Sequence, residues 1–209
     1  MLGNLYDRAL TGERCWIRRD DGTVSGLPVH SWLRTLAADA GFDRAMVGLC
    51  AGPTIDLGCG PGRFVADLVQ QGVPALGVDQ SATAVAMARR RGAPALRRDL
   101  FEPLPGTGRW STVLLADGNV GIGGDPLRVL RRAAELLGSK GQCVIEVDAA
   151  TKDVQSHWVR LESAVTVGPW FRWATVGAEG LRGLADAVGL AVTAIESMDN
   201  RVLATLSAA

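Results

Sequence analysis

The sequence predicts an α/β protein with a doubly wound sheet of seven strands, mostly parallel, that ends in an antiparallel hairpin at its C-terminal edge. Three observations lead to this prediction. Short aliphatic runs alternate with amphipathic stretches between residues 53 and 148, which is the pattern of repeated βαβ units around a parallel sheet. A glycine-rich turn at 58–62 follows the first aliphatic run. Near the C-terminus, two apolar runs at 190–197 and 201–207 flank the turn-like residues 198–200.

The core strands and the helices between them can be placed in order. The strands are expected at 54–57, 75–79, 95–99, 112–116 and 142–147, and the helices at 62–71, 82–91, 126–137 and 178–188. Ser81 and Asp125 precede two of these helices as candidate N-caps, because their side chains can accept a hydrogen bond from a free backbone N–H. A glycine marks the expected end of each helix, namely Gly72, Gly92, Gly138 and Gly189.

The chain of 209 residues is expected to form one domain, since it shows no internal repeat, low-complexity tract or linker rich in Pro or Ser. Its expected parts are an N-terminal helical cap at 1–50, a core at 53–148, a lid-like insertion at 149–176, and a C-terminal helix and hairpin at 177–209. Within the cap, a helix is expected from about Pro28 to Gly41.

Five of the six tryptophans lie in the cap and the insertion rather than in the core. Aromatic side chains concentrated in these two segments suggest that they form a wall over a ligand pocket. The alternative role for each tryptophan is packing against the sheet. Trp32, Trp158 and Trp170 are therefore candidate substrate-contacting residues. The same flanks can also form a dimer interface, so the protein is expected to be a monomer or a homodimer.

The composition disfavours several classes of partner. Lys plus Arg and Asp plus Glu both number 22, so the net charge is zero and gives no general attraction to nucleic acid or to an acidic membrane. The four cysteines are scattered without a histidine set, which indicates neither a metal site nor a disulfide framework. The N-terminus lacks a signal-peptide pattern, and no apolar run is long enough to cross a bilayer. A cytoplasmic protein is expected.

The turn after the first strand reads Gly58-Cys59-Gly60-Pro61-Gly62. Glycines allow a sharp turn, and backbone N–H groups then lie open at the start of the next helix, where they can bind a phosphate or a carboxylate. A dinucleotide site favours a glycine at the position of Arg63, so an oxidoreductase is disfavoured. Asp56, just before the turn, suits a cationic group of a ligand better than a phosphate.

The run Asp56-Leu-Gly-Cys-Gly-Pro-Gly62 resembles the first motif of the class I S-adenosylmethionine-dependent methyltransferases, and the resemblance extends over residues 54–148. It implies a Rossmann-like sheet and S-adenosylmethionine as the cofactor, with S-adenosylhomocysteine as the product. The stretch from Leu114 to Pro126 is also similar to a subgroup of small bacterial methyltransferases of undefined substrate.

The resemblance implies roles for individual residues. Asp79, at the end of the second core strand, would hold the ribose hydroxyls, with Gln80 beside it at the adenine edge. Asp99 and Leu100, after the third strand, would read the adenine. The other positions implied at the cofactor are Tyr6, Asp56, Gly58, Cys59, Gly60, Gly62, Asp117 and Asn119. Tyr6 would close over the methionine end, with helix packing as its alternative role.

Methyl transfer from a sulfonium depends mostly on positioning, and it needs a general base only when the acceptor binds protonated. His157 is the candidate base, because an imidazole titrates near neutral pH. Asn119 is the candidate catalytic polar contact. His30, Asp117, Glu146 and Asp148 are further candidates for the base.

The expected function is methyl transfer to oxygen or nitrogen of a small-molecule acceptor in secondary metabolism. The Asn-Pro-Pro-aromatic signature of amino-group methylation on nucleic acids is absent from the sequence. The alternative is a protein of the same fold that binds the cofactor without transferring methyl, for example an aid to cyclisation or rearrangement, or an accessory subunit.

Overall fold

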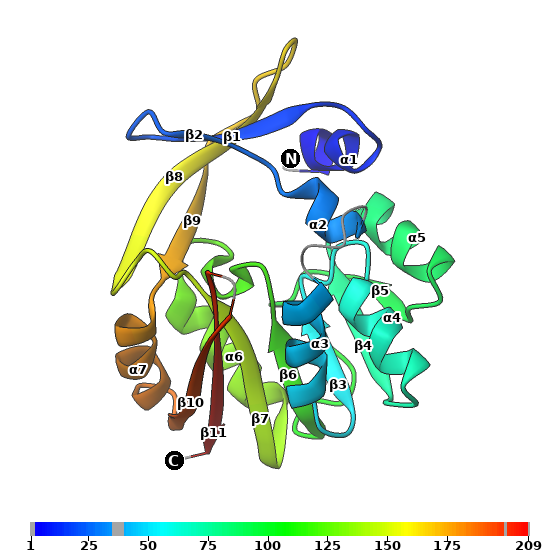
Figure 1. Ribbon diagram of the computed structural model, residues 1–209, viewed down its shortest axis with the longest axis vertical. Helices are drawn as coiled ribbons and strands as arrows, with labels where there is room; N and C mark the ends of the chain where they lie inside the picture. Colours follow the sequence, from blue (N-terminus) through cyan, green and yellow to red (C-terminus); the bar gives the residue numbers. More distant parts are fainter. Residues whose placement is uncertain (1–2, 35–39, 199, 209) are drawn as a thin grey trace.

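A computed structural model of the chain describes residues 3–34, 40–198 and 200–208. Two sheets organise these residues. One has seven strands in the order β10-β11-β7-β6-β3-β4-β5, and the other has four in the order β2-β1-β8-β9. The four-stranded sheet arches over one end of the seven-stranded sheet (Figure 1).

The seven-stranded sheet is the predicted one. Its strands are β3 (Thr54–Leu57), β4 (Ala75–Asp79), β5 (Ala95–Arg97), β6 (Trp110–Leu115), β7 (Leu137–Val147), β10 (Leu190–Met198) and β11 (Arg201–Ala208). The five core strands pair in parallel, and β11 and β10 add an antiparallel edge beyond β7. The prediction of a mostly parallel sheet with an antiparallel C-terminal hairpin is therefore confirmed.

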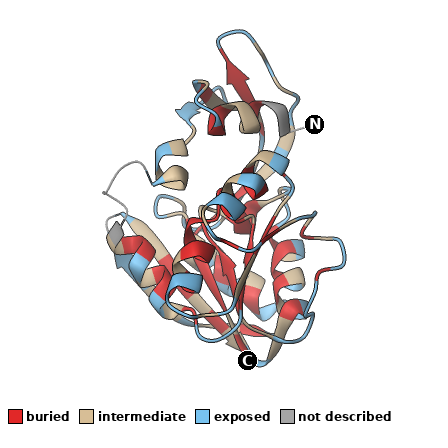
Figure 2. Cartoon of the chain, turned by 90° about the vertical axis from the view of Figure 1, so that its right-hand side faces the viewer, coloured by how far each residue is buried: buried red, intermediate tan, exposed pale blue. Residues whose placement is uncertain are grey.

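Helices cover both faces of this sheet. They are α3 (Ala40–Leu49), α4 (Arg63–Gln70), α5 (Ala82–Arg90), α6 (Pro126–Leu136) and α7 (Ala178–Asp186). Successive strand residues point to opposite faces: Leu114 packs in a cluster with residues of α3 and α4, whereas its neighbours Val113 and Leu115 pack with residues of α6 and α7. Figure 2 shows the buried residues along these strands and on one side of the covering helices.

The predicted helix ends agree with the structure at most positions. Ser81 accepts a hydrogen bond from the N–H of Ala84 at 2.9 Å, and Asp125 accepts one from Arg128 at 3.0 Å, so both act as N-caps. Gly72, Gly92 and Gly189 have positive φ, as a glycine that ends a helix requires. Gly138 does not end a helix, because α6 stops at Leu136 and β7 begins directly at Leu137.

The second sheet was not predicted. It consists of β1 (Cys15–Arg19), β2 (Val24–Gly26), β8 (Val154–Ser163) and β9 (Phe171–Val176), all antiparallel. The segment expected to be a helical cap thus contributes two strands besides the helices α1 (Gly3–Leu10), α2 (Val29–Leu33) and α3. β1 pairs with β8, so these strands depend on contacts between distant parts of the chain.

The prediction of one helix from about Pro28 to Gly41 was wrong. α2 ends at Leu33, because Arg34 adopts a left-handed backbone conformation with φ of 53°. Residues 35–39 lie outside the described residues, and α3 then begins at Ala40. No helix in the described part of the chain is both long and apolar enough to span a membrane.

Candidate functional site

The glycine turn joins β3 to α4 at the edge of the seven-stranded sheet that faces the second sheet. Gly58, Gly60 and Gly62 have φ of 80°, 53° and 76°, values that side-chain-bearing residues rarely adopt. A Cβ atom at Gly58 would lie 2.6 Å from Nδ2 of Asn119, and one at Gly62 would lie 2.6 Å from Cβ of Ala88. Both the backbone conformation and the close packing therefore require glycine.

Asn119 holds this turn in place. Its side-chain amide donates hydrogen bonds to the carbonyl oxygens of Leu57 at 3.0 Å and Gly58 at 2.9 Å. Asn119 begins a short 3₁₀ helix, η2 (Asn119–Gly121), after β6 and is buried. The residue predicted as a catalytic contact thus connects the loops that follow β3 and β6.

Asp79 links the end of β4 to the same turn. Its carboxylate accepts hydrogen bonds from the N–H of Gly60 at 2.9 Å and the N–H of Ser81 at 2.8 Å. Burial is the largest effect on the carboxyl group and raises its pKa. The hydroxyl of Ser81 in turn donates to Asp7 at 2.5 Å, which ties α1 to the end of β4.

A cavity of about 940 Å³ lies between the two sheets. We call its wall from the seven-stranded sheet the floor, which comprises Gly58, Cys59, Gly60, Pro61, Arg63, Asp79, Gln80, Ser81, Arg97, Asp117, Asn119 and Ile122. We call its wall from the second sheet and adjoining residues the roof, which comprises Ile17, Ser25, Gly26, Leu161, Pro169, Trp170, Phe171 and Trp173. Tyr6, Leu27, Pro28 and Trp32 close the side. The volume falls within the range of small-molecule sites.

Ten predicted site residues meet at this cavity, namely Tyr6, Trp32, Gly58, Cys59, Gly60, Asp79, Gln80, Asp117, Asn119 and Trp170. Tyr6 and Trp32 contact each other edge to face, with ring centroids 5.5 Å apart. Burial and the nearby carboxylate of Asp79 raise the pKa of Tyr6 well above its ordinary value, so its hydroxyl stays protonated.

Other predicted residues do not line the cavity. Asp56 is buried in β3, and within the described residues neither of its carboxylate oxygens has a hydrogen-bond partner. Burial raises its pKa to about 8. Asp99 accepts a hydrogen bond from the N–H of Phe101, and Leu100 is buried in the core. Gly62 lies at the start of α4, against α5.

Trp158 and His157 are also absent from the cavity wall. Trp158 is 44% exposed, and the Arg172 guanidinium lies 5.1 Å from its ring centroid. His157 lies opposite Trp173 on β9, and its Nε2 is 3.5 Å from the hydroxyl of Thr175. Trp173 and Phe171, which do line the cavity, were missed as site residues. Alternation along the strands places Trp158 on the opposite face from Phe171 and Trp173, whereas His157 shares their face but lies outside the cavity wall.

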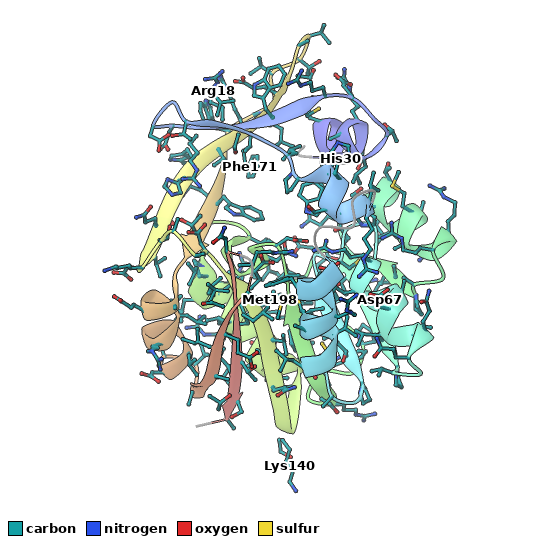
Figure 3. The ribbon with its side chains drawn as sticks, in the orientation of Figure 1. Arg18, His30, Asp67, Lys140, Phe171 and Met198 are labelled. Atoms are coloured by element: carbon teal, nitrogen blue, oxygen red, sulfur yellow. The ribbon has the colours of Figure 1, made fainter. Side chains whose placement is uncertain are left out.

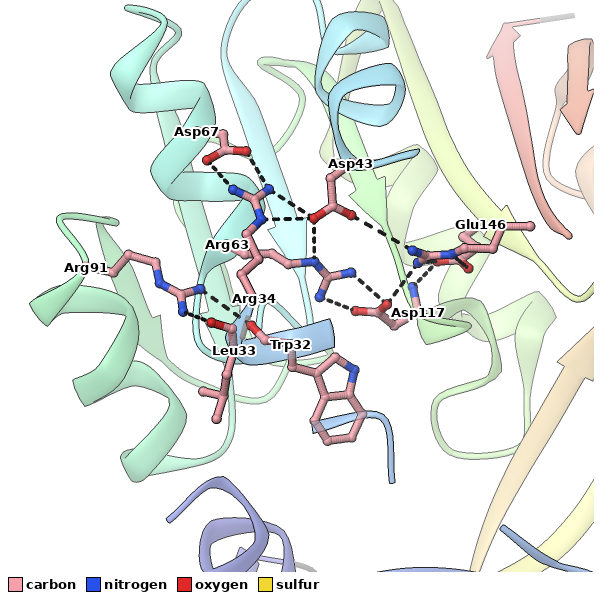
Figure 4. A network of polar contacts seen from close by, with 10 residues as sticks. Trp32, Leu33, Arg34, Asp43, Arg63, Asp67, Arg91, Asp117 and Glu146 are labelled. Carbon is pink, nitrogen blue, oxygen red and sulfur yellow. Dashed lines mark hydrogen bonds and ion pairs between the residues drawn. The ribbon is translucent and has the colours of Figure 1, made fainter. Parts of the chain in front are cut away.

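A chain of ion pairs runs beside the floor (Figure 4). Arg63 donates two hydrogen bonds to Asp117, at 2.7 and 2.8 Å, and a third to Asp43 at 3.2 Å. Arg34 donates to Asp43 and to Asp67. Through Asp43, these ion pairs connect the loop after β6 with Arg34. Arg34 follows α2, the helix that carries the cavity-lining Trp32.

Three of the candidate bases, Asp117, Glu146 and Asp148, line a smaller cavity of about 360 Å³ that shares Pro28, Asp117 and Trp173 with the large one. Glu146 accepts hydrogen bonds from Arg201 and from the N–H of Asp117. Asp148 accepts hydrogen bonds from the backbone N–H groups of Ala150 and Thr151. Within the described residues, no group of three or more His, Cys, Asp or Glu side chains is arranged to hold a metal ion.

A family model described as a methyltransferase domain matches residues 29–195. The chain belongs to this family. The match includes the glycine turn, all the parallel strands and the second sheet's β8 and β9. The predicted membership of the class I methyltransferases is thereby confirmed. No curated protein matches the sequence of this methyltransferase.

Solved methyltransferase structures share the fold. An S-adenosylmethionine-dependent methyltransferase from Bacteroides fragilis, in complex with S-adenosyl-L-homocysteine, has a TM-score of 0.81 at 19% identity, covering 100% of this chain and 94% of that chain. A sugar N-methyltransferase from Streptoalloteichus has a TM-score of 0.57 at 22% identity, covering 82% and 87%. A 1,6-didemethyltoxoflavin N1-methyltransferase from Burkholderia thailandensis has a TM-score of 0.61 at 17% identity, covering 82% and 77%.

Proposed function

We propose that this methyltransferase binds S-adenosylmethionine on the floor of the large cavity and transfers its methyl group to oxygen or nitrogen of a small molecule. One observation carries the proposal: the glycine turn and the Asp79 carboxylate form one wall of a cavity with room for a nucleoside and a second small ligand. When bound, the cofactor supplies an activated methyl group on a positively charged sulfur.

The floor suits such a cofactor chemically. The glycines at 58 and 60 leave no side chain between the backbone and the cavity, and a Cβ at Gly60 would lie 3.2 Å from the hydroxyl of Tyr6. Asp79 keeps carboxylate lone pairs beyond its two backbone hydrogen bonds, so it can accept hydrogen bonds from ribose hydroxyls. Gln80 offers an amide beside it.

The chain's contribution to the reaction is positioning. Asn119 fixes the turn, and Tyr6 with Trp32 closes the side of the cavity and keeps water from the reacting groups. Both carboxylate oxygens of Asp117 accept hydrogen bonds from Arg63. The nitrogen of an amine or heterocycle can attack with its own lone pair, and a phenol must first lose its proton.

We also propose that the protein acts in secondary metabolism and is located in the cytoplasm. Structural relatives from Streptoalloteichus and Burkholderia act on a sugar and on 1,6-didemethyltoxoflavin, as their names state. The balanced charge of the chain supports a small-molecule acceptor over a nucleic acid.

Calorimetry of the purified protein tests the cofactor site. We expect S-adenosylmethionine and S-adenosylhomocysteine to bind with micromolar Kd and NAD to bind far more weakly. Asp79→Ala is expected to weaken both nucleosides by about tenfold to a hundredfold, because a charged hydrogen-bond acceptor is lost. Asp186→Ala, at the end of α7, is the control and keeps wild-type affinity. Absence of binding to the folded wild type would overturn the proposal.

A further inference from the structure

The roof of the cavity is apolar on its inner face and charged on its outer face. Ile17 and Leu161 are directly opposite on β1 and β8, and both line the cavity together with Phe171 and Trp173 of β9. Figure 3 shows Phe171 beneath the second sheet, on the side of the seven-stranded sheet, and Arg18 on the other side. The two faces therefore meet different surroundings.

Four of the five Arg and Glu side chains in the strands of this sheet lie on its outer face, namely Arg18, Arg160, Glu162 and Arg172. Glu162 accepts hydrogen bonds from Trp16 at 2.7 Å, Arg18 at 2.9 Å and Arg160 at 2.7 Å. Arg172 lies over Trp158 on the same side. On the inner face, the residues of β1, β8 and β9 that line the cavity are aliphatic or aromatic, and Arg19 and His157 of the same face lie outside the cavity wall.

Helix α1 covers one end of the inner face, where Leu5 and Ala9 cluster with Cys15 and Leu161, and the part of this face toward Trp173 lines the cavity. Ile17, Phe171 and Trp173 are only partly buried, although they are large and apolar. Trp32 of α2 and the half-exposed Trp170 extend the same surface to the side and the rim. Binding of an apolar ligand to such a surface is favourable, because it removes apolar area of both the ligand and the cavity wall from contact with water.

All the charged side chains known to line the cavity belong to the floor, and each has a partner within the described residues. Arg63 is paired with Asp117, Asp79 accepts two backbone N–H groups, and Arg97 donates to the carbonyl of Gln80 at 3.3 Å. The roof therefore contributes aromatic faces and shape to binding, and the charges stay at the floor.

From this arrangement we propose that the acceptor is a planar aromatic molecule, uncharged in the part that contacts the roof, such as a phenol, an aromatic amine or a nitrogen heterocycle. The inference rests on the proposed function, since it assigns the floor to the cofactor and the roof to the acceptor. Phe171, Trp173 and Trp32 are its stacking surfaces. Offset or edge-to-face contacts between aromatic rings contribute binding free energy beyond that of the apolar area they bury.

The test uses 2-naphthol as a probe and measures its Kd by calorimetry. Three comparison compounds separate the contributions: decahydro-2-naphthol has a similar size without aromatic faces, naphthalene-2-sulfonate adds a charge, and D-glucosamine represents a polar acceptor. We expect 2-naphthol to bind at least about tenfold more tightly than each of the three. Equal or tighter binding of decahydro-2-naphthol or glucosamine would overturn the proposal.

Variants in the same sheet locate the bound probe. Trp173→Leu and Phe171→Leu remove inner-face rings, and each is expected to weaken 2-naphthol about tenfold. Trp158→Leu removes an outer-face ring from the neighbouring strand and is the matched control, with binding within about twofold of wild type. An equal loss in Trp158→Leu would contradict the proposal. Phe171→Leu keeps the test open if Trp173→Leu does not fold.

Titration of S-adenosylhomocysteine into the same variants separates the two proposals. Trp173→Leu and Phe171→Leu are expected to bind this nucleoside like the wild type. Binding of 2-naphthol without any binding of S-adenosylhomocysteine would refute the proposed function and leave an aromatic pocket. Binding of S-adenosylhomocysteine without preference for 2-naphthol would support the function and refute the aromatic acceptor.

Discussion

The floor and the roof of the large cavity are built in different ways. The floor comes from loops at the ends of parallel strands, and backbone groups, carboxylates and an amide form its surface. The roof comes from an antiparallel sheet and adjoining residues, and its surface is formed mostly by side chains. The backbone conformation at the strand ends therefore determines the shape of the floor, whereas the side chains of the second sheet determine which ligands the roof accepts.

The largest expected effect comes from Gly58→Ala in the floor. The added Cβ would lie 2.6 Å from Asn119 Nδ2, and alanine at this positive φ is strained by about 1–3 kcal/mol. We expect the loss of more than about a hundredfold in affinity for S-adenosylhomocysteine, measured by calorimetry. Gly183→Ala in α7, where a Cβ meets no atom within 4 Å, is the control and leaves affinity unchanged. Wild-type affinity in Gly58→Ala would show that the floor tolerates displacement.

Asp56 is expected to make stability depend on pH. Burial raises its pKa from 3.8 to about 8. Because the folded protein keeps this proton while the unfolded chain releases it near pH 4, the stabilisation is complete below pH 4 and is lost as pH rises through about 8. We expect the Tm of the wild type to fall from pH 5 to pH 8 more steeply than that of Asp56→Asn. Parallel slopes in thermal melts would contradict this account.

A smaller effect is expected when the connection between the two regions is cut. Arg34 joins the end of α2 to Asp43 and Asp67, and its loss leaves the buried Asp43 with fewer donors. Arg34→Met should cost about 1–3 kcal/mol in denaturant unfolding. It should also weaken 2-naphthol binding through the displaced Trp32, and Arg34→Lys should recover part of both losses. Unchanged unfolding and binding would show that α2 does not need this ion pair.

The smallest effect is expected at His157, which does not line the cavity. Once an acceptor is found by screening, His157→Ala should keep turnover within about twofold of the wild type at every pH from 6 to 9. A fall of tenfold or more near neutral pH, with unchanged affinity for the cofactor, would restore His157 as the general base.

The parallel sheet could be predicted because its signals are local. The core strands are apolar runs next to helices, and two of these helices begin at a side-chain cap, Ser81 or Asp125. The floor followed from the same signals, since Gly58 to Gly62 and Asp79 stand at the ends of predicted strands.

The roof could not be predicted because it depends on pairing between distant segments. Cys15 pairs with Ser163 and Arg19 with Val159, and neither short segment shows on its own which partner it has. The expectation that tryptophans in the flanks form a pocket wall named Trp170, which lines the cavity, and Trp158, which lies on the outer face. Composition located the aromatic region, and only the strand register separated its two faces.

The central claim is that floor and roof bind two different ligands at the same time. It is tested most directly by titrating 2-naphthol into protein that is already saturated with S-adenosylhomocysteine. The account predicts one-to-one binding of 2-naphthol with an affinity no weaker than in the free protein. Displacement of either ligand by the other would contradict it, because both would then occupy the same part of the cavity.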